Sequence, residues 1–113
     1  MKASPLASLE REYERLRQRL ARIGYISQGS VLDRSTLKSP RSGYQWTRKV
    51  SRKTITVALS PEQFHGLAQA VENRKLLTKT IQQMEKLSRQ IIFASLPDTR
   101  RRKKLEPKVL GLN

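Results

Sequence analysis

The chain has 113 residues, and its 24 lysines and arginines against 9 aspartates and glutamates give a formal net charge of +15 at pH 7. With 36% hydrophobic residues and few aromatic ones, it can form one small domain with a core of Leu, Ile and Val. Cysteine is absent, which excludes disulfides and thiolate sites, and the charge favours a polyanionic partner: nucleic acid first, then an anionic membrane surface or an acidic protein.

The first predicted element is a helix over residues 5–23. Ser4 suits its N-cap, Pro5 its first turn and Gly24 its C-terminal end. Its apolar residues recur at spacings of three and four, which indicates a helix that packs lengthwise on another helix. These residues are Leu6, Leu9, Tyr13, Leu16, Leu20 and Ile23.

Three short strands are predicted next, at about residues 30–37, 44–50 and 53–59. If Ser51 and Arg52 form a two-residue loop, the last two strands pair as an antiparallel hairpin, although neither residue favours the positive φ of such a loop. The expected pairs are Val50 with Lys53, Arg48 with Ile55, Trp46 with Val57 and Tyr44 with Leu59. The alternation predicts an apolar face, covered by the core, of Tyr44, Trp46, Ile55, Val57 and Leu59. The opposite face carries Gln45, Thr47, Lys49, Thr54, Thr56 and Ala58.

A second helix is predicted over residues 61–94, with Ser60 as N-cap and Gln63 at the capping-box position. At about 50 Å it is longer than a small sheet can cover. Its second half is therefore expected to pack on the first helix or on another chain, and the sequence does not separate these alternatives. The candidate partner or dimer interface is the apolar stripe Leu77, Ile81, Met84, Leu87 and Ile91.

These elements predict an α+β fold with a single domain over residues 1–95 and a basic, flexible tail over 96–113. The tail carries a run of five cations, which suits phosphate contact, a membrane-surface patch or solubilisation. The cations are Arg100, Arg101, Arg102, Lys103 and Lys104.

No constellation of catalytic residues stands out. The single histidine, His65, falls in the first turns of the second helix, where it suits a surface or capping position better than a general base. The carboxylates of Glu10, Glu12 and Glu14 do not converge with an open metal position, and no phosphate-loop or zinc-protease motif occurs. We therefore expect no enzyme activity, metal or cofactor. No apolar run reaches the roughly 20 residues of a spanning helix, so we expect a soluble, cytoplasmic protein. Association with the nucleoid is an open alternative.

The strongest functional signal is the positive charge of residues 25–60, which hold seven cations against Asp33 alone. A two-stranded ribbon fits the major groove of DNA, where Gln, Arg and Lys read base edges and Thr meets phosphate. The alternative is an ordinary solvated sheet face. Tyr44 and Trp46 suit the core better than base stacking. The candidate nucleic-acid-binding residues, besides the tail cations, are Arg34, Lys38, Arg41, Gln45, Thr47, Arg48, Lys49, Arg52, Lys53, Thr54 and Thr56.

The order of "ISQGSV", "YQWTRKV", "KTITVALSPEQ" and "NRKLL" resembles a family of small, basic bacterial proteins whose genes are often found near transposases. The similarity covers most of residues 9–93. Members commonly carry a cysteine pair and a Gly-rich hairpin turn, which this chain replaces with "DRSTLKSPRSG" and Ser51-Arg52. The resemblance implies association with mobile-element machinery. Three strands followed by a helix is also similar to the arm-type DNA-binding domains of tyrosine recombinases.

The leading hypothesis is a noncatalytic accessory protein that binds DNA or structured RNA beside a recombinase, transposase or RNA-guided effector. One rival is a protein-interaction module that binds a larger partner through its helices. Another is a basic structural component of a ribonucleoprotein. A homodimer fits any of the three.

Overall fold

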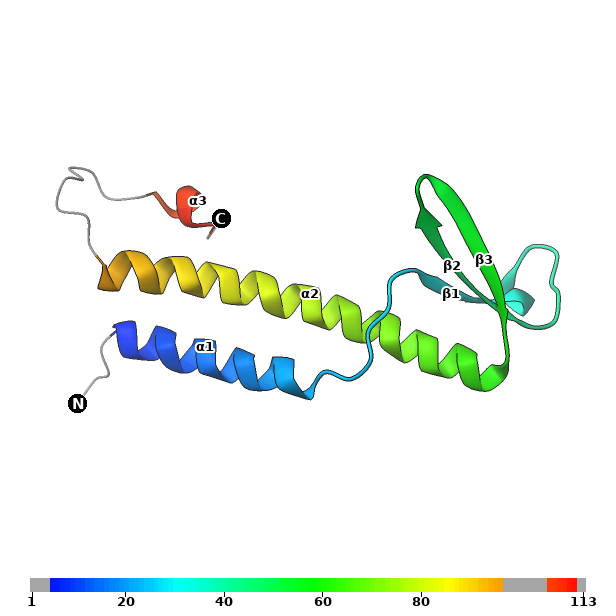
Figure 1. The fold of residues 1–113 in the computed structure, drawn as a ribbon, viewed down its shortest axis with the longest axis horizontal. Helices are drawn as coiled ribbons and strands as arrows, with labels where there is room; N and C mark the ends of the chain where they lie inside the picture. Colours follow the sequence, from blue (N-terminus) through cyan, green and yellow to red (C-terminus); the bar gives the residue numbers. More distant parts are fainter. Residues whose placement is uncertain (1–4, 97–105, 112–113) are drawn as a thin grey trace. The chain divides into compact units, whose positions relative to one another are not determined.

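The computed structural model describes residues 5–96 and 106–111 of the chain (Figure 1). It has an N-terminal helix, a three-stranded antiparallel sheet and a long helix, so the expected α+β fold is confirmed. The elements are α1 (Pro5–Arg22), β1 (Ser30–Asp33), a 3₁₀ turn (Arg34–Thr36), β2 (Tyr44–Val50), β3 (Lys53–Leu59), α2 (Pro61–Ser95) and α3 (Pro107–Leu110). The cations at 100–104 lie outside the described residues.

The chain divides into two compact units, and α2 contributes residues to both. One unit is the continuous segment Ile23–Leu77, which holds the sheet and the first half of α2. The other joins Met1–Arg22 to Thr78–Asn113, and so combines α1, the second half of α2 and α3. The expectation of a single domain stays a prediction.

The sheet has the order β1-β2-β3 with both neighbouring pairs antiparallel. The register between β2 and β3 is the expected one, from Tyr44 opposite Leu59 to Val50 opposite Lys53. Ser51 and Arg52 form the two-residue loop with φ of 49° and 69°. Both values are positive, as the twist of a tight hairpin requires, even though neither residue type favours this region.

The first strand ends four residues earlier than expected, because the chain turns at Asp33. The Asp33 carboxylate accepts hydrogen bonds from the backbone N–H of Ser35 at 3.0 Å and from its hydroxyl at 2.7 Å. An aspartate that binds the backbone two residues on caps a turn rather than continuing a strand. Residues Arg34–Thr36 accordingly form a 3₁₀ turn.

In the sheet unit, the start of α2 is joined closely to the end of β3. Ser60 and Gln63 form the expected reciprocal capping box, with N–H to side-chain oxygen distances of 2.9 and 3.1 Å. Ala70 and Val71 of α2 are buried. The segment before β1 is tied to this helix, because the Ser27 N–H donates to the Ala70 carbonyl at 3.1 Å.

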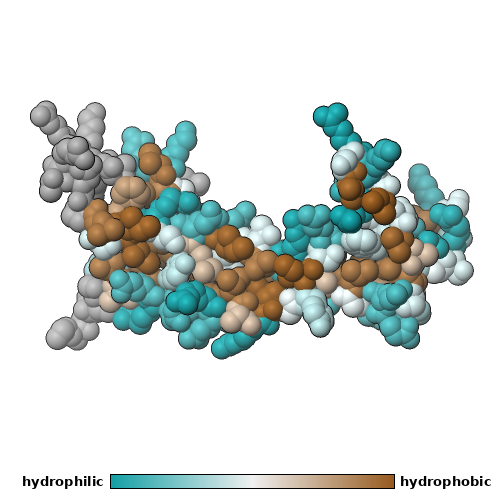
Figure 2. Space-filling model, in the orientation of Figure 1, coloured by the Kyte–Doolittle hydropathy of each residue, from teal (hydrophilic) through white to brown (hydrophobic). Residues whose placement is uncertain are grey.

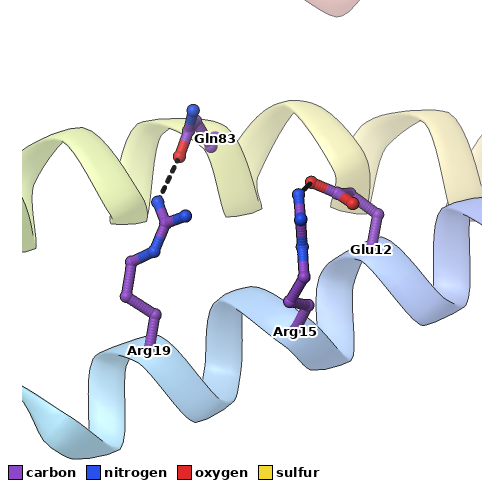
Figure 3. A network of polar contacts seen from close by, with 4 residues as sticks. All are labelled: Glu12, Arg15, Arg19 and Gln83. Atoms are coloured by element: carbon purple, nitrogen blue, oxygen red, sulfur yellow. Dashed lines mark hydrogen bonds and ion pairs between the residues drawn. The ribbon is translucent and has the colours of Figure 1, made fainter.

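In the helical unit, α1 and the second half of α2 lie side by side and antiparallel (Figure 1). Leu16 of α1 is 2% exposed and Thr80 of α2 is fully buried, and the Arg19 guanidinium donates to Gln83 Oε1 at 3.5 Å (Figure 3). Arg15 forms an ion pair with Glu12 one turn earlier in α1, so this contact lies within the helix (Figure 3). Of the two packing modes left open by the sequence, α2 is therefore seen packing on α1.

The C-terminal turn α3 contacts the same half of α2. The Arg89 Nε–H donates to the backbone carbonyl of Leu110, and Gly111 ends α3 in the left-handed conformation with φ of 77°. The positive φ of Gly111 favours glycine, because L side chains rarely adopt this backbone conformation. Arg89 thereby fixes the end of the described chain.

Candidate nucleic-acid interface

The hairpin of β2 and β3 has one polar face, which we call the Gln45 face. The register places Gln45 opposite Ala58, Thr47 opposite Thr56 and Lys49 opposite Thr54, and alternation directs these side chains to one side of the ribbon. The candidates Gln45, Thr47, Lys49, Thr54 and Thr56 are therefore brought together as expected. Lys49, Thr54 and Thr56 are exposed, and Gln45 and Thr47 are half-buried.

Arg34 approaches the same face from the chain that follows β1. Its Nε–H donates to Gln45 Oε1 at 3.2 Å, and its backbone N–H donates to the Gly43 carbonyl at 3.0 Å. The Arg41 N–H in turn donates to the Arg34 carbonyl at 3.2 Å. The loop that carries Lys38 and Arg41 is thus closed around Arg34, and both of these side chains are exposed.

Arg48 and Lys53 lie on the opposite face from Lys49. Arg48 pairs with Ile55 and Lys53 with Val50, so both belong to the side of the ribbon that carries Trp46. The Arg48 guanidinium carbon lies 5.6 Å from the centre of the Trp46 ring. Arg52 lies in the loop at the tip and is exposed. The structure therefore distributes the candidate cations over both faces and the tip.

None of the sheet-region cations forms an ion pair within the described residues. The ion pairs found there join Glu12 to Arg15, Glu14 to Arg17 and Glu72 to Lys75, each within one helix. Asp33, the one acidic residue of the sheet region, is engaged by Ser35, whose hydroxyl and backbone N–H hold the Asp33 pKa below its ordinary value. The positive charge of the hairpin is thus free to meet an external anion.

The expected core face of the hairpin is only partly covered. At the base, Tyr44 stacks on Phe64 of α2 with ring centres 4.3 Å apart, and Leu59 is half-buried. Nearer the tip, Ile55 is 38% exposed and Val57 is 42% exposed. The expectation that this whole face is buried is wrong beyond its base, because α2 meets the ribbon only at that end. Figure 2 shows hydrophobic side chains on the hairpin between hydrophilic ones.

The candidate interface stripe on α2 is divided by its exposure. Leu77, Met84, Leu87 and Ile91 are half-buried, whereas Ile81 is 43% exposed. Met84, Leu87 and Ile91 belong to the helical unit, where α1 lies along α2. Together with the buried Thr80, they follow the three-and-four spacing of a helix-packing seam. The stripe predicted from the sequence contained the exposed Ile81 where the structure buries the polar Thr80.

Residues 5–96 and 106–111 contain no group of three His, Asp or Glu side chains placed to hold a metal ion. No helix in these ranges is long and apolar enough to cross a membrane. Comparison with known proteins matched no family model, no curated protein and no solved structure. The resemblance drawn from the sequence motifs therefore stays a prediction.

Proposed function

We propose that this protein is a noncatalytic nucleic-acid-binding protein whose β2–β3 hairpin contacts duplex DNA or structured RNA. One observation carries the proposal: the sheet region holds seven cations, and none of them forms an ion pair within the described residues. A net charge of +15 also makes self-association unfavourable and polyanion binding favourable. Contacts to phosphate oxygens supply most of the affinity in such complexes.

The shape of the hairpin supports contact within a groove. Residues from Arg48 to Ala58 are exposed except Val50, so both faces of the ribbon meet solvent over most of its length. A two-stranded ribbon of this kind fits the major groove of B-form DNA, which is about 12 Å wide. On the Gln45 face, Lys49 and the two threonines of β3 offer donors to phosphate, and the Gln45 amide is oriented by Arg34.

The test compares two triple variants that lose the same charge. Lys49→Ala, Arg52→Ala and Lys53→Ala remove cations from the hairpin, and Arg11→Ala, Arg17→Ala and Arg22→Ala remove exposed cations from α1. Binding to a labelled DNA duplex and to a labelled RNA stem-loop is measured by fluorescence anisotropy, with circular dichroism to confirm the fold. We expect the hairpin variant to lose at least tenfold more affinity than the α1 variant, at about 1 kcal/mol or more per lost contact. Equal losses in the two variants would remove the hairpin from the site.

We further propose that the protein acts as an accessory to a larger protein, such as a transposase, recombinase or RNA-guided effector. The motif resemblance supports this placement, and so does the exposure of apolar residues on α2, where Ile81 and Ile92 are 43% and 50% exposed. These residues also favour the alternative of a protein-interaction module whose cations serve solubility. Complexes that survive nuclease treatment and high salt but are lost on Ile81→Ser and Ile92→Ser would favour that alternative.

A further inference from the structure

The side of the hairpin opposite the Gln45 face has its own chemistry, and we call it the Trp46 face. Toward the tip it consists of Trp46 and Arg48 on β2 and, directly opposite them, Val57 and Ile55 on β3. Lys53 lies on the same side as Ile55, two residues nearer the tip and opposite Val50. Ile55 and Val57 are 38% and 42% exposed, so the ribbon presents adjacent apolar side chains to water beside two cations.

The Trp46 ring is held in place before any ligand arrives. Its Nε1–H donates to the Gln28 carbonyl at 2.9 Å. Gly29 makes this approach possible, since its φ is 100° and a Cβ there would lie 2.3 Å from the Thr47 carbonyl oxygen and 2.6 Å from Trp46 Nε1. The polar group of the indole is thus satisfied within the protein. Trp46 is half-buried and the Arg48 guanidinium lies over its ring, so Trp46 contributes the part of its apolar ring that these contacts leave uncovered.

A nucleobase that has left its helix matches this surface. Its faces are flat and apolar, and its own phosphate lies within reach of a flanking cation, so stacking on apolar and aromatic side chains combines with charge contact. Arg48 and Lys53 flank the apolar residues on this face, and neither forms an ion pair within the described residues. The acidic side chain nearest in register, Asp33, lies opposite Tyr44 at the far end and is bound to Ser35. Base pairing and stacking hide base faces in a duplex, so the ligand must offer unpaired bases.

We propose that the Trp46 face binds unpaired nucleobases, so that the hairpin lies where a duplex opens into single strands, with its Gln45 face toward the paired part. This inference rests on the proposed function of the β2–β3 hairpin and adds the structural class of the nucleic acid. Single-stranded DNA and single-stranded RNA share the chemistry that the Trp46 face would recognise, and the experiment includes both.

Trp46 is the single tryptophan of the chain, so its fluorescence reports directly on this face. The whole chain is titrated with a blunt duplex, with a forked duplex of the same paired sequence, and with single strands of DNA and of RNA. We expect the fork to bind about tenfold more tightly than the blunt duplex, as stacking of one or two bases implies, and to quench Trp46 emission. Equal affinity for fork and blunt duplex, without quenching by any unpaired strand, would overturn the inference.

The matched variant is Ile55→Thr with Val57→Thr, which keeps two β-branched strand formers and the full charge while removing the apolar surface. We expect it to bind the blunt duplex as the parent chain does and to lose the preference for the fork. An unchanged preference would overturn the inference, with Trp46 emission and circular dichroism showing that the hairpin is intact. A dimer in sedimentation equilibrium that dissociates in this variant would assign the face to a second copy of the chain and would likewise overturn it.

The two proposals fail in different ways. If the parent chain binds duplex and fork equally and only Lys49→Ala, Arg52→Ala, Lys53→Ala weakens both, the function stands and the Trp46 face is not a base-binding site. If the parent chain binds neither duplex, fork nor single strand at low salt, the function and the inference built on it both fall.

Discussion

The ring of Tyr44 on β2 stacks on the ring of Phe64 in the first turns of α2, with centres 4.3 Å apart and planes inclined by 27°. This contact fixes the base of the hairpin to the helix, while the remainder of the ribbon extends into solvent. Offset stacking of this kind adds about 0.5–1.5 kcal/mol to the burial of the two rings. The Tyr44–Phe64 stack therefore acts together with the Ser60–Gln63 capping box to orient the hairpin on the first half of α2.

Replacing Phe64 by Ala should destabilise the sheet unit by about 2 kcal/mol, because the half-buried ring and its stack on Tyr44 are both lost. The measurement is urea unfolding followed by Trp46 fluorescence. The control is His65→Ala, which removes an exposed neighbouring ring and should change the unfolding free energy far less. Equal effects of the two substitutions would show that the stack does not hold the hairpin.

Replacing Thr80 by Val should stabilise the helical unit by about 1 kcal/mol. The Thr80 hydroxyl is fully buried and, among the described residues, has no hydrogen-bond partner, so a methyl group of equal size removes a desolvated polar atom. Thermal unfolding by circular dichroism measures the change, and exposed Thr78→Val serves as control. A lower melting temperature for the Thr80 variant would mean that the hydroxyl is satisfied in solution.

The loop Ser51-Arg52 should become more stable as Asn-Gly. Both positions have positive φ, which Asn and Gly adopt at lower cost than Ser and Arg, and the expected gain is roughly 1 kcal/mol. The comparison is with Ser51→Ala and Arg52→Ala, which remove the same charge and keep the strain. If the Asn-Gly variant and the Ala-Ala variant have the same melting temperature, the positive φ of the loop does not limit the stability of the hairpin.

Asp33 should titrate below the ordinary aspartate pKa of 3.8, chiefly because the Ser35 hydroxyl, and then the Ser35 N–H, bind its charged form. Ser35→Ala should raise this pKa in an NMR titration of the carboxyl carbon, and exposed Ser39→Ala should not. Because folding lowers the pKa of Asp33, its hydrogen bonds with Ser35 stabilise the folded protein fully above pH 3.8. This stabilisation is lost as the pH falls through the pKa of Asp33 in the folded protein. A stability difference between parent and Ser35→Ala that persists below that pKa would contradict this account.

The salt dependence of binding should report the number of phosphate contacts. If six to eight cations of hairpin and tail reach phosphates, affinity for duplex DNA should fall by roughly three to four orders of magnitude between about 50 and 200 mM salt. Removing Lys49, Arg52 and Lys53 should lower the slope of log affinity against log salt by about three. An unchanged slope would mean that these three side chains do not touch phosphate.

The hairpin could be predicted from sequence because its two strands alternate with period two, and that alternation fixes the register once the loop length is known. The end of β1 could not be placed in the same way. Val31 and Leu32 continue an apolar pattern, but the side chain of Asp33 competes for the backbone and turns the chain. A side chain that hydrogen-bonds to the nearby backbone can end a strand without changing the pattern of hydrophobic residues, so that pattern does not reveal the end of β1.

The sequence was sufficient to predict which residues belong to each face of the hairpin, but not how much of each face is exposed. The Gln45 face followed from alternation, but alternation alone does not say how far α2 extends over the opposite face. That limit is set by where Phe64 meets Tyr44, which leaves Ile55 and Val57 uncovered. Thr80 was overlooked for a related reason: a polar residue at a packing position interrupts the apolar stripe that marks a helix seam.

The way the chain is divided has a consequence for how the protein can be dissected. Residues 23–77 are one uninterrupted stretch, whereas the helical unit is assembled from stretches on either side of it. The sheet unit is thus an insertion in the helical one. Isolating it takes one cut between Arg22 and Ile23 and one inside α2 between Leu77 and Thr78, whereas deleting it requires a linker to reconnect Arg22 with Thr78.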